Sequence, residues 1–415
     1  MKSYSKSLYK QLFEDSFYYF LTKIIPGITG LFSVSLFIRW VGSDEYGKFS
    51  LIISFVMAIG ALSSGWLNQS ILRYYSIDKK KKSFFESIFY GILISFSISF
   101  LILFTTNKLI LKLDFIALFV TYFSLISVIL FRLKSSLLQA NLQAYQIAKM
   151  TSLQSSLALL LPLLIFIKYD YHLGLLIGVS LSYFLTGYIK NIFKKPIIPI
   201  MKNLDSLRKY HKFGLPISFR ISIGLLIPFI DKWFVMFFFN DSTTGLYSGY
   251  SEVILKIFSI ILFPITLAIH PLVTKYWNDG KKNNALILIK KGIGIHFLIF
   301  IFSILILFSF RESFFILIQK FIPGLTINFK ELGIPIFISG FLWQLSLLVH
   351  KPLELAEKPI YMVCGILISL SVSVIGNILL IPKIGLIAIS LNSVFSAAAY
   401  IIVVIIFIIR DKTLA

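Results

Sequence analysis

Charged residues are scarce in this 415-residue chain, at 14%, whereas soluble domains hold about a quarter. A single cysteine, Cys364, excludes an intramolecular disulfide framework and a cysteine-rich metal site. The five histidines are scattered without ligand spacing, and neither an Asp-x-Asp motif nor a glycine-rich phosphate loop occurs. We therefore expect no metal centre, no cofactor and no enzymatic activity.

Long apolar runs dominate the chain instead. It is 57% hydrophobic, and its mean hydropathy is +0.88. About 20 apolar residues cross the ~30 Å of bilayer hydrocarbon as a helix, and long continuous runs favour helices over a barrel. The pattern predicts an all-α polytopic membrane protein with twelve transmembrane helices. The predicted segments are 15–38, 48–70, 86–106, 113–133, 149–167, 172–192, 213–238, 245–270, 290–310, 329–349, 359–381 and 385–409.

The basic residues predict the orientation of these segments. Most of the 40 lysines and arginines fall in every second polar break, among them Arg132 and Lys134 at the end of the fourth segment. By the positive-inside rule, both termini are cytoplasmic. The net charge of +22 therefore indicates contact with anionic membrane lipids, and no nucleic-acid motif accompanies it.

Two polar breaks, WVGSDEYGKFSL and FNDSTTGLYSGY, repeat one pattern around Gly47 and Gly245, 198 residues apart. We expect both glycines to permit tight turns at the outer surface. Two more pairs follow in the same order, LLQANLQAY with PLELAEKPIY and GLLIGVSLS with GLIAISLNS. The order predicts two parallel six-helix lobes, 1–200 and 201–415, with a linker near 193–212 and a central cavity. Such duplication is typical of transporters.

Few ionisable residues lie inside the predicted helices, and such residues are candidates for substrate contacts. Lys23 and Arg220 occupy the first helix of each predicted lobe, which favours a shared cationic site, although each side chain could instead extend to the interface. Glu252 and Lys256 are spaced i,i+4 with the acid first, which favours a pair on one helix face. This pair is either structural or a substrate contact.

Asp231 and Arg39 lie near helix ends on the predicted outer side. For Asp231, the sequence leaves open a hydrogen bond at the helix end or gate, or coupling to protons or sodium. Arg39 either lines an outer gate or ends its helix in solvent.

Sugar recognition commonly uses aromatic faces and amide side chains. Trp343 and Gln344 are central in the tenth segment, and Asn377 and Asn392 lie in the last two. The alternative for each of these residues is a hydrogen bond between helices.

Several motifs together carry a family resemblance: GSDEYGKFS, LNQSILRYYS, FIDKWFVMFF, TTGLYSGYSEVILKI, FPITLAIHPLVTKYW and LLIPKIGLIAISL. In this order, they resemble the polysaccharide-exporter branch of the multidrug/oligosaccharidyl-lipid/polysaccharide exporter superfamily, most of all the O-antigen and capsule repeat-unit flippases. Asp231 matches an acidic position of that family.

The resemblance implies a substrate, which is an oligosaccharide on undecaprenyl pyrophosphate. It implies movement of this substrate to the periplasmic leaflet of a bacterial inner membrane by alternating access, for O-antigen lipopolysaccharide or capsule biosynthesis. It also implies a polysaccharide polymerase and a chain-length regulator as partners.

A rival interpretation is an ion-coupled multidrug or cation antiporter of the same superfamily. Three intramembrane bases, Lys23, Arg220 and Lys256, stand against two acids, Asp231 and Glu252. This balance favours an anionic substrate.

Overall fold

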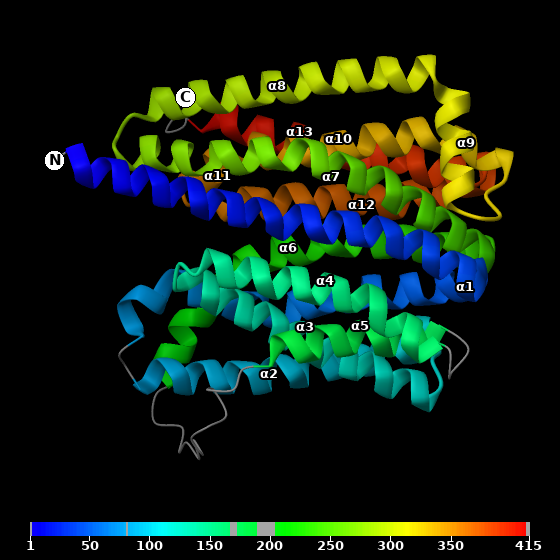
Figure 1. The fold of residues 1–415 in the computed structure, drawn as a ribbon, viewed down its shortest axis with the longest axis horizontal. Helices are drawn as coiled ribbons and strands as arrows, with labels where there is room; N and C mark the ends of the chain where they lie inside the picture. Colours follow the sequence, from blue (N-terminus) through cyan, green and yellow to red (C-terminus); the bar gives the residue numbers. More distant parts are fainter. Residues whose placement is uncertain (1, 80–81, 167–171, 189–203, 412–415) are drawn as a thin grey trace. The chain divides into compact units, whose positions relative to one another are not determined.

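The computed structural model describes residues 2–79, 82–166, 172–188 and 204–411. Every regular element in these ranges is a helix (Figure 1). Between its two ends, a helix pairs its backbone N–H and C=O groups internally, which hydrocarbon requires of an apolar segment. The predicted all-α membrane class is confirmed.

Thirteen α-helices and two short helices of other types make up the described part of the chain. The elements are α1 Lys2–Asp78, α2 Lys82–Thr106, the π-helix η1 Asn107–Leu111, α3 Phe115–Ala140, α4 Ala144–Phe166, α5 His172–Gly187, α6 Leu204–Phe238, α7 Asp241–Asn278, α8 Lys282–Ser309, α9 Arg311–Phe321, the 3₁₀-helix η2 Ile327–Leu332, α10 Gly333–Val349, α11 Lys351–Leu355, α12 Pro359–Ile384 and α13 Ile387–Arg410.

The first two predicted segments are the two arms of α1. They meet at Gly42, whose φ of 85° and ψ of 165° break the helix at a position where a residue without Cβ is unstrained. Ten helices in the described ranges are long and apolar enough to cross a membrane, and α5, with 16 residues, is shorter. Each predicted segment thus has a helix or helix arm, whereas twelve crossings remain a prediction.

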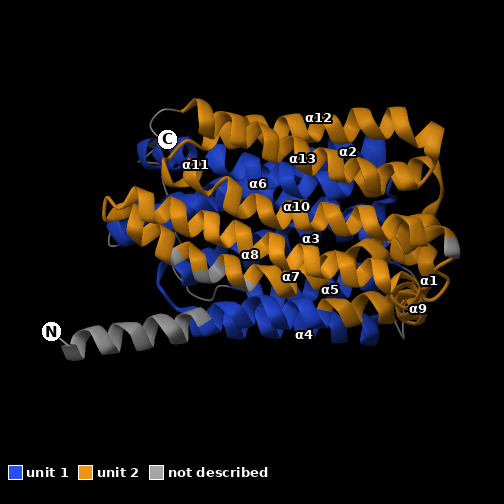
Figure 2. Cartoon of the chain, turned by 90° about the horizontal axis from the view of Figure 1, so that it is seen from above, with its two compact units in different colours: residues 1–29, 49–229 blue, residues 30–48, 230–415 orange. Residues whose placement is uncertain are grey.

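Two compact units divide the chain (Figure 2). Unit 1 comprises residues 1–29 and 49–229, and unit 2 comprises residues 30–48 and 230–415. The predicted lobe boundary at 200 lies outside the described residues, as does most of the linker predicted at 193–212, whose last residues begin α6. The lobes 1–200 and 201–415 stay a prediction.

Polar residues fix the starts of two helices. The Asp114 carboxylate accepts a hydrogen bond from the Ala117 amide at 2.7 Å and caps α3. The Asn240 side chain accepts one from the Thr243 amide at 2.8 Å and caps α7. Each cap satisfies an amide that has no partner inside the helix.

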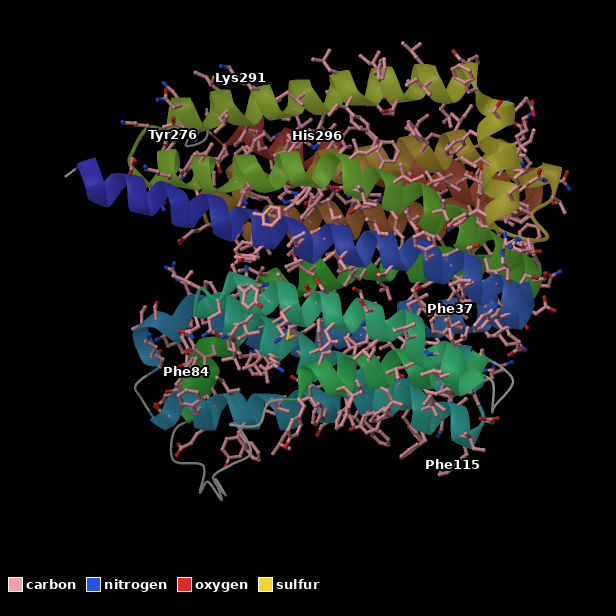
Figure 3. The ribbon with its side chains drawn as sticks, in the orientation of Figure 1. Phe37, Phe84, Phe115, Tyr276, Lys291 and His296 are labelled. Carbon is pink, nitrogen blue, oxygen red and sulfur yellow. The ribbon has the colours of Figure 1, made fainter. Side chains whose placement is uncertain are left out.

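Large apolar side chains cover the outside of the helices. Phe115 is 82% exposed and stands clear of α3, whereas Phe84 is packed inside unit 1 (Figure 3). Polar side chains such as Ser63 and Asn377 are fully buried. This distribution suits an apolar surrounding, because hydrocarbon solvates the exposed phenylalanines and the interior satisfies the polar groups. The chain is a multi-pass membrane protein.

Candidate functional site

Within unit 2, Gly47 lies against the start of α7, and Gly245 lies against the start of the second arm of α1. Both lie inside helices, and the left-handed residue of the first break is Gly42. A Cβ on Gly47 would overlap the Asp241 carbonyl oxygen, and a Cβ on Gly245 would overlap the Ser43 carbonyl oxygen. Because Ser43 and Asp241 occupy matching positions of the repeat, the two contacts are equivalent. These glycines therefore serve close backbone approach between α1 and α7.

Unit 2 also contains an ionic network around Glu252, here called the Glu252 network. Lys232 Nζ lies 2.9 Å from Glu252 Oε1, and Lys256 Nζ lies 3.4 Å from Oε2. The Tyr46 hydroxyl donates to Oε2 at 3.4 Å, and Lys256 also donates to the Gly30 carbonyl at 2.9 Å. The network thereby ties α6, α7 and both arms of α1 together.

Two lysines on one glutamate leave the Glu252 network with one net positive charge. The Lys256 and Glu252 side chains are 29% and 28% exposed, whereas Lys232 is only 8% exposed. The i,i+4 pair expected from the sequence therefore forms, and Lys232 from α6 joins it. The excess charge on a half-buried lysine can attract an anion.

Hydrogen-bonding side chains of unit 2 surround Asp231, and this group is here called the Asp231 cluster. Asp231 is 6% exposed. Its Oδ1 accepts hydrogen bonds from Ser373 Oγ at 3.3 Å and Asn377 Nδ2 at 3.1 Å, and its Oδ2 accepts one from Ser393 Oγ at 2.8 Å. Asn392 Nδ2 donates to Asn377 Oδ1 at 2.9 Å. The two asparagines considered for sugar recognition thus join α12 and α13 to this carboxylate.

The Asp231 cluster holds a carboxylate among neutral groups. Within the described part of the chain, no lysine, arginine or histidine pairs with Asp231, and the adjacent Lys232 is paired with Glu252. The Oδ1 atom of Asn392 is buried there without a hydrogen-bond partner among the described residues. An isolated carboxylate is costly in such a place unless it binds a proton or a cation. Carboxylate, amide and hydroxyl oxygens are the ligands that hard cations prefer.

The remaining basic candidates lie on different helices. Lys23 is exposed on the first arm of α1, and Arg220 is half-buried on α6, both within unit 1. Arg39 is exposed in unit 2, and its Nη2 donates to the Lys320 carbonyl of α9. Arg39 therefore contacts a helix end.

Trp343 and Gln344 are half-buried on α10. The Trp343 ring packs against Tyr400 of α13, with centroids 5.9 Å apart. The Oε1 atom of Gln344 is buried and has no hydrogen-bond partner within the described residues. It is an open acceptor for a hydroxyl donor.

Sequence reasoning missed a role for Arg132, which it counted among the topology residues. Arg132 Nη2 donates to the Met57 carbonyl at 3.2 Å, on the second arm of α1. No carboxylate pairs with Arg132 in the described part of the chain. Its position inside the predicted segment 113–133 was the signal that could have marked it as intramembrane.

Comparison with known proteins assigns the chain to a family. Residues 12–277 match the model of a family described as polysaccharide biosynthesis proteins. The chain belongs to this family. The predicted membership of the exporter superfamily is thereby confirmed. No curated protein matches the chain.

Solved structures of transporters share the fold. The lipid II flippase MurJ, in an inward closed conformation, superposes with a TM-score of 0.75 at 17% identity, covering 94% of this chain and 87% of that one. The MATE multidrug transporter DinF-BH gives a TM-score of 0.66 at 16% identity, covering 98% of this chain and 96% of that one. The chain therefore has the two-lobed helical fold of these transporters.

Proposed function

We propose that this protein is a flippase for lipid-linked oligosaccharides. In this proposal, it moves a repeat unit on undecaprenyl pyrophosphate from the cytoplasmic to the periplasmic leaflet of a bacterial inner membrane by alternating access. The product would serve O-antigen or capsular polysaccharide synthesis, beside a polymerase and a chain-length regulator. The match of residues 12–277 to a polysaccharide biosynthesis family carries this proposal.

The charges of the Glu252 network support an anionic substrate. A pyrophosphate that enters the membrane needs cations, because burying its charge uncompensated is prohibitive. Lys256 is 29% exposed and shares its carboxylate partner with Lys232. In our proposal, Lys256 contacts the pyrophosphate. Lys23 and Arg220 of unit 1 are separate candidates for the same role, and each is tested by its own variant.

The sugar chain needs different groups. Trp343 offers a half-buried aromatic face, and the neighbouring Gln344 offers an amide oxygen that has no partner among the described residues. Sugars bind such pairs by stacking and by hydroxyl hydrogen bonds. We assign the oligosaccharide to this part of α10.

A second candidate function is ion-coupled export of a cationic compound. The observation in its favour is Asp231, a buried carboxylate held only by neutral donors in the described residues. In an antiporter, such a carboxylate would exchange the cationic substrate for an ion. In the flippase, the same carboxylate would bind only the coupling ion, a proton or sodium.

Leaflet transfer in liposomes tests the two functions. The purified protein is reconstituted with a lipid-linked oligosaccharide labelled on the sugar, and accessibility of the label is followed under proton or sodium gradients. The variants are Lys23→Ala, Arg220→Ala and Lys256→Ala, with the exposed Lys281→Ala as the matched control.

The flippase requires transfer by the wild type and by Lys281→Ala, with a loss of about tenfold or more in at least one other variant. Transfer that survives all three substitutions would remove the proposed cations from the mechanism. Uptake of a cationic dye without any sugar transfer would instead establish the antiporter.

A further inference from the structure

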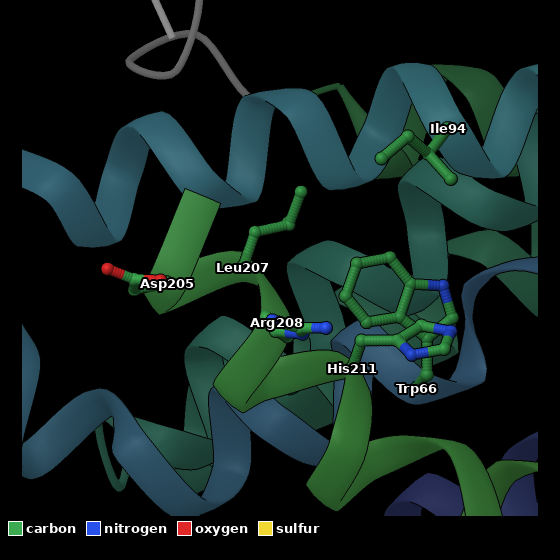
Figure 4. Close-up of a pocket in the computed structure, with 6 residues that line it drawn as sticks. All are labelled: Trp66, Ile94, Asp205, Leu207, Arg208 and His211. Carbon is green, nitrogen blue, oxygen red and sulfur yellow. The ribbon is translucent and has the colours of Figure 1, made fainter. Parts of the chain in front are cut away.

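A pocket of about 380 Å³ lies in unit 1, apart from the residues discussed above. Six side chains from α1, α2 and α6 line it (Figure 4): Trp66, Ile94, Asp205, Leu207, Arg208 and His211. Its volume lies within the range of small-molecule sites, which is about 300–1,000 Å³. It can therefore hold a head group and the first part of an acyl chain.

The inner wall of the pocket is apolar. Trp66 is 2% exposed and belongs to a hydrophobic cluster, and Ile94 and Leu207 pack against that cluster. The indole N–H of Trp66 already donates to the Ser63 carbonyl at 3.0 Å, so the side chain offers ring surface. The His211 ring meets that surface edge-on, with centroids 5.4 Å apart (Figure 4). This wall suits hydrocarbon.

The mouth of the pocket carries one charge of each sign. Asp205 and Arg208 are both exposed, one turn apart on α6. Neither forms a hydrogen bond or an ion pair within the described part of the chain, whereas the neighbouring Lys209 lies 3.4 Å from Asp78. The mouth thus offers a cation and an anion that are available to a ligand.

We propose that this pocket binds a membrane phospholipid whose head group carries both a phosphate and a primary ammonium. Arg208 binds the phosphate through charge-assisted hydrogen bonds, and Asp205 accepts the ammonium. Trp66, Ile94 and Leu207 hold the start of an acyl chain. The site is a lipid site distinct from the Lys256 region proposed for transport.

The two charges at the mouth determine which head groups fit the pocket. A purely anionic head group would satisfy Arg208 but meet the Asp205 carboxylate as a like charge. A choline head group has no N–H to donate to Asp205. A soluble phosphate compound leaves the apolar wall uncovered. Only an amphiphile with a zwitterionic, N–H-bearing head group satisfies every side of the pocket.

Native mass spectrometry of the full chain in detergent tests this proposal. The probes are phosphatidylethanolamine, phosphatidylglycerol and phosphatidylcholine with identical acyl chains, and glycerophosphoethanolamine as the soluble head group. The variants are Arg208→Gln, Asp205→Asn and Leu207→Trp, which fills the pocket. Lys212→Gln is the matched control, because Lys212 is an exposed cation on the same helix outside the pocket.

We expect phosphatidylethanolamine to bind about tenfold more tightly than the other two lipids, as one charge-assisted contact allows. Arg208→Gln and Leu207→Trp should each weaken its binding about tenfold. Asp205→Asn should abolish the preference over phosphatidylglycerol, and Lys212→Gln should change nothing.

Equal binding of the three lipids would overturn the proposal. So would equally tight binding of glycerophosphoethanolamine, or an Arg208→Gln effect no larger than that of Lys212→Gln. Thermal unfolding of each variant shows that it is folded, and the exposed Arg208 and Asp205 variants remain informative if Leu207→Trp does not fold.

Discussion

Asp231 and Glu252 are two carboxylates in membrane-spanning helices of the same unit, yet their surroundings are opposite. Glu252 is held by two lysines, and the Glu252 network has a net charge of +1. Asp231 is held by two serines and an asparagine, so the ionised Asp231 cluster has a net charge of −1. A carboxylate whose charge is compensated inside the protein can stabilise structure, whereas one that is not must bind a proton or cation.

The two sites also suit different ligands. The net positive charge of the Glu252 network favours an anion, and the oxygen atoms of the Asp231 cluster favour a cation. An ion-coupled flippase needs both, one for the substrate and one for the coupling ion. Each prediction below breaks one side of this comparison and should leave the other intact.

The largest effect is expected from Asp231→Asn. The amide keeps the size of the side chain but removes the charge that would bind the coupling ion. We expect transfer of the lipid-linked sugar to fall roughly tenfold or more and to lose its dependence on the ion gradient. Leaflet transfer in liposomes measures both. Thermal unfolding should change little, and transfer that still follows the gradient would contradict ion binding at Asp231.

Glu252→Gln should lower stability instead. It leaves Lys232 and Lys256 facing each other without their shared carboxylate. Because Glu252 and Lys256 are only partly buried, we expect the free energy of unfolding to fall by about 1–3 kcal/mol. Denaturant titration of the purified protein measures it. The double variant Glu252→Gln with Lys232→Gln should regain part of the loss, and a fully additive double variant would contradict a shared network.

Ser393→Ala removes one hydrogen bond from the Asp231 carboxylate. We expect a loss of about 1 kcal/mol in the free energy of unfolding, because a buried acceptor loses one of three donors. Ser371→Ala is the control, since Ser371 is an exposed residue that bonds to the Leu367 carbonyl within its own helix. Equal losses in thermal unfolding for both variants would mean that the contact to Asp231 adds nothing.

The smallest effect is expected from Tyr46→Phe. The Tyr46 hydroxyl reaches Glu252 at 3.4 Å, which is long for a hydrogen bond, and two lysines remain on the carboxylate. We expect a loss below about 1 kcal/mol by the same denaturant titration. A loss as large as that of Glu252→Gln would show that Tyr46, and not the lysines, dominates the network.

Local sequence patterns predicted much of what is observed. The apolar runs predicted a helix or helix arm at each of the twelve segments, because a run in hydrocarbon must satisfy its own backbone. The i,i+4 spacing predicted that Glu252 and Lys256 can pair, because residues four apart share a helix face. The repeat identified Gly47 and Gly245 as turn residues. In the structure, both allow the backbones of α1 and α7 to approach closely, and the break in α1 is at Gly42.

The sequence alone determined that this chain is a helical, multi-pass membrane protein with a repeat, because composition and helical spacing are local properties. Only the tertiary structure decided what surrounds each charge. It brought Lys232 to Glu252, Asn377 to Asp231 and Arg132 to the Met57 carbonyl, and it left Asp205 and Arg208 open at a pocket. These contacts depend on which helices pack together, and that packing follows from side-chain fit across the whole fold.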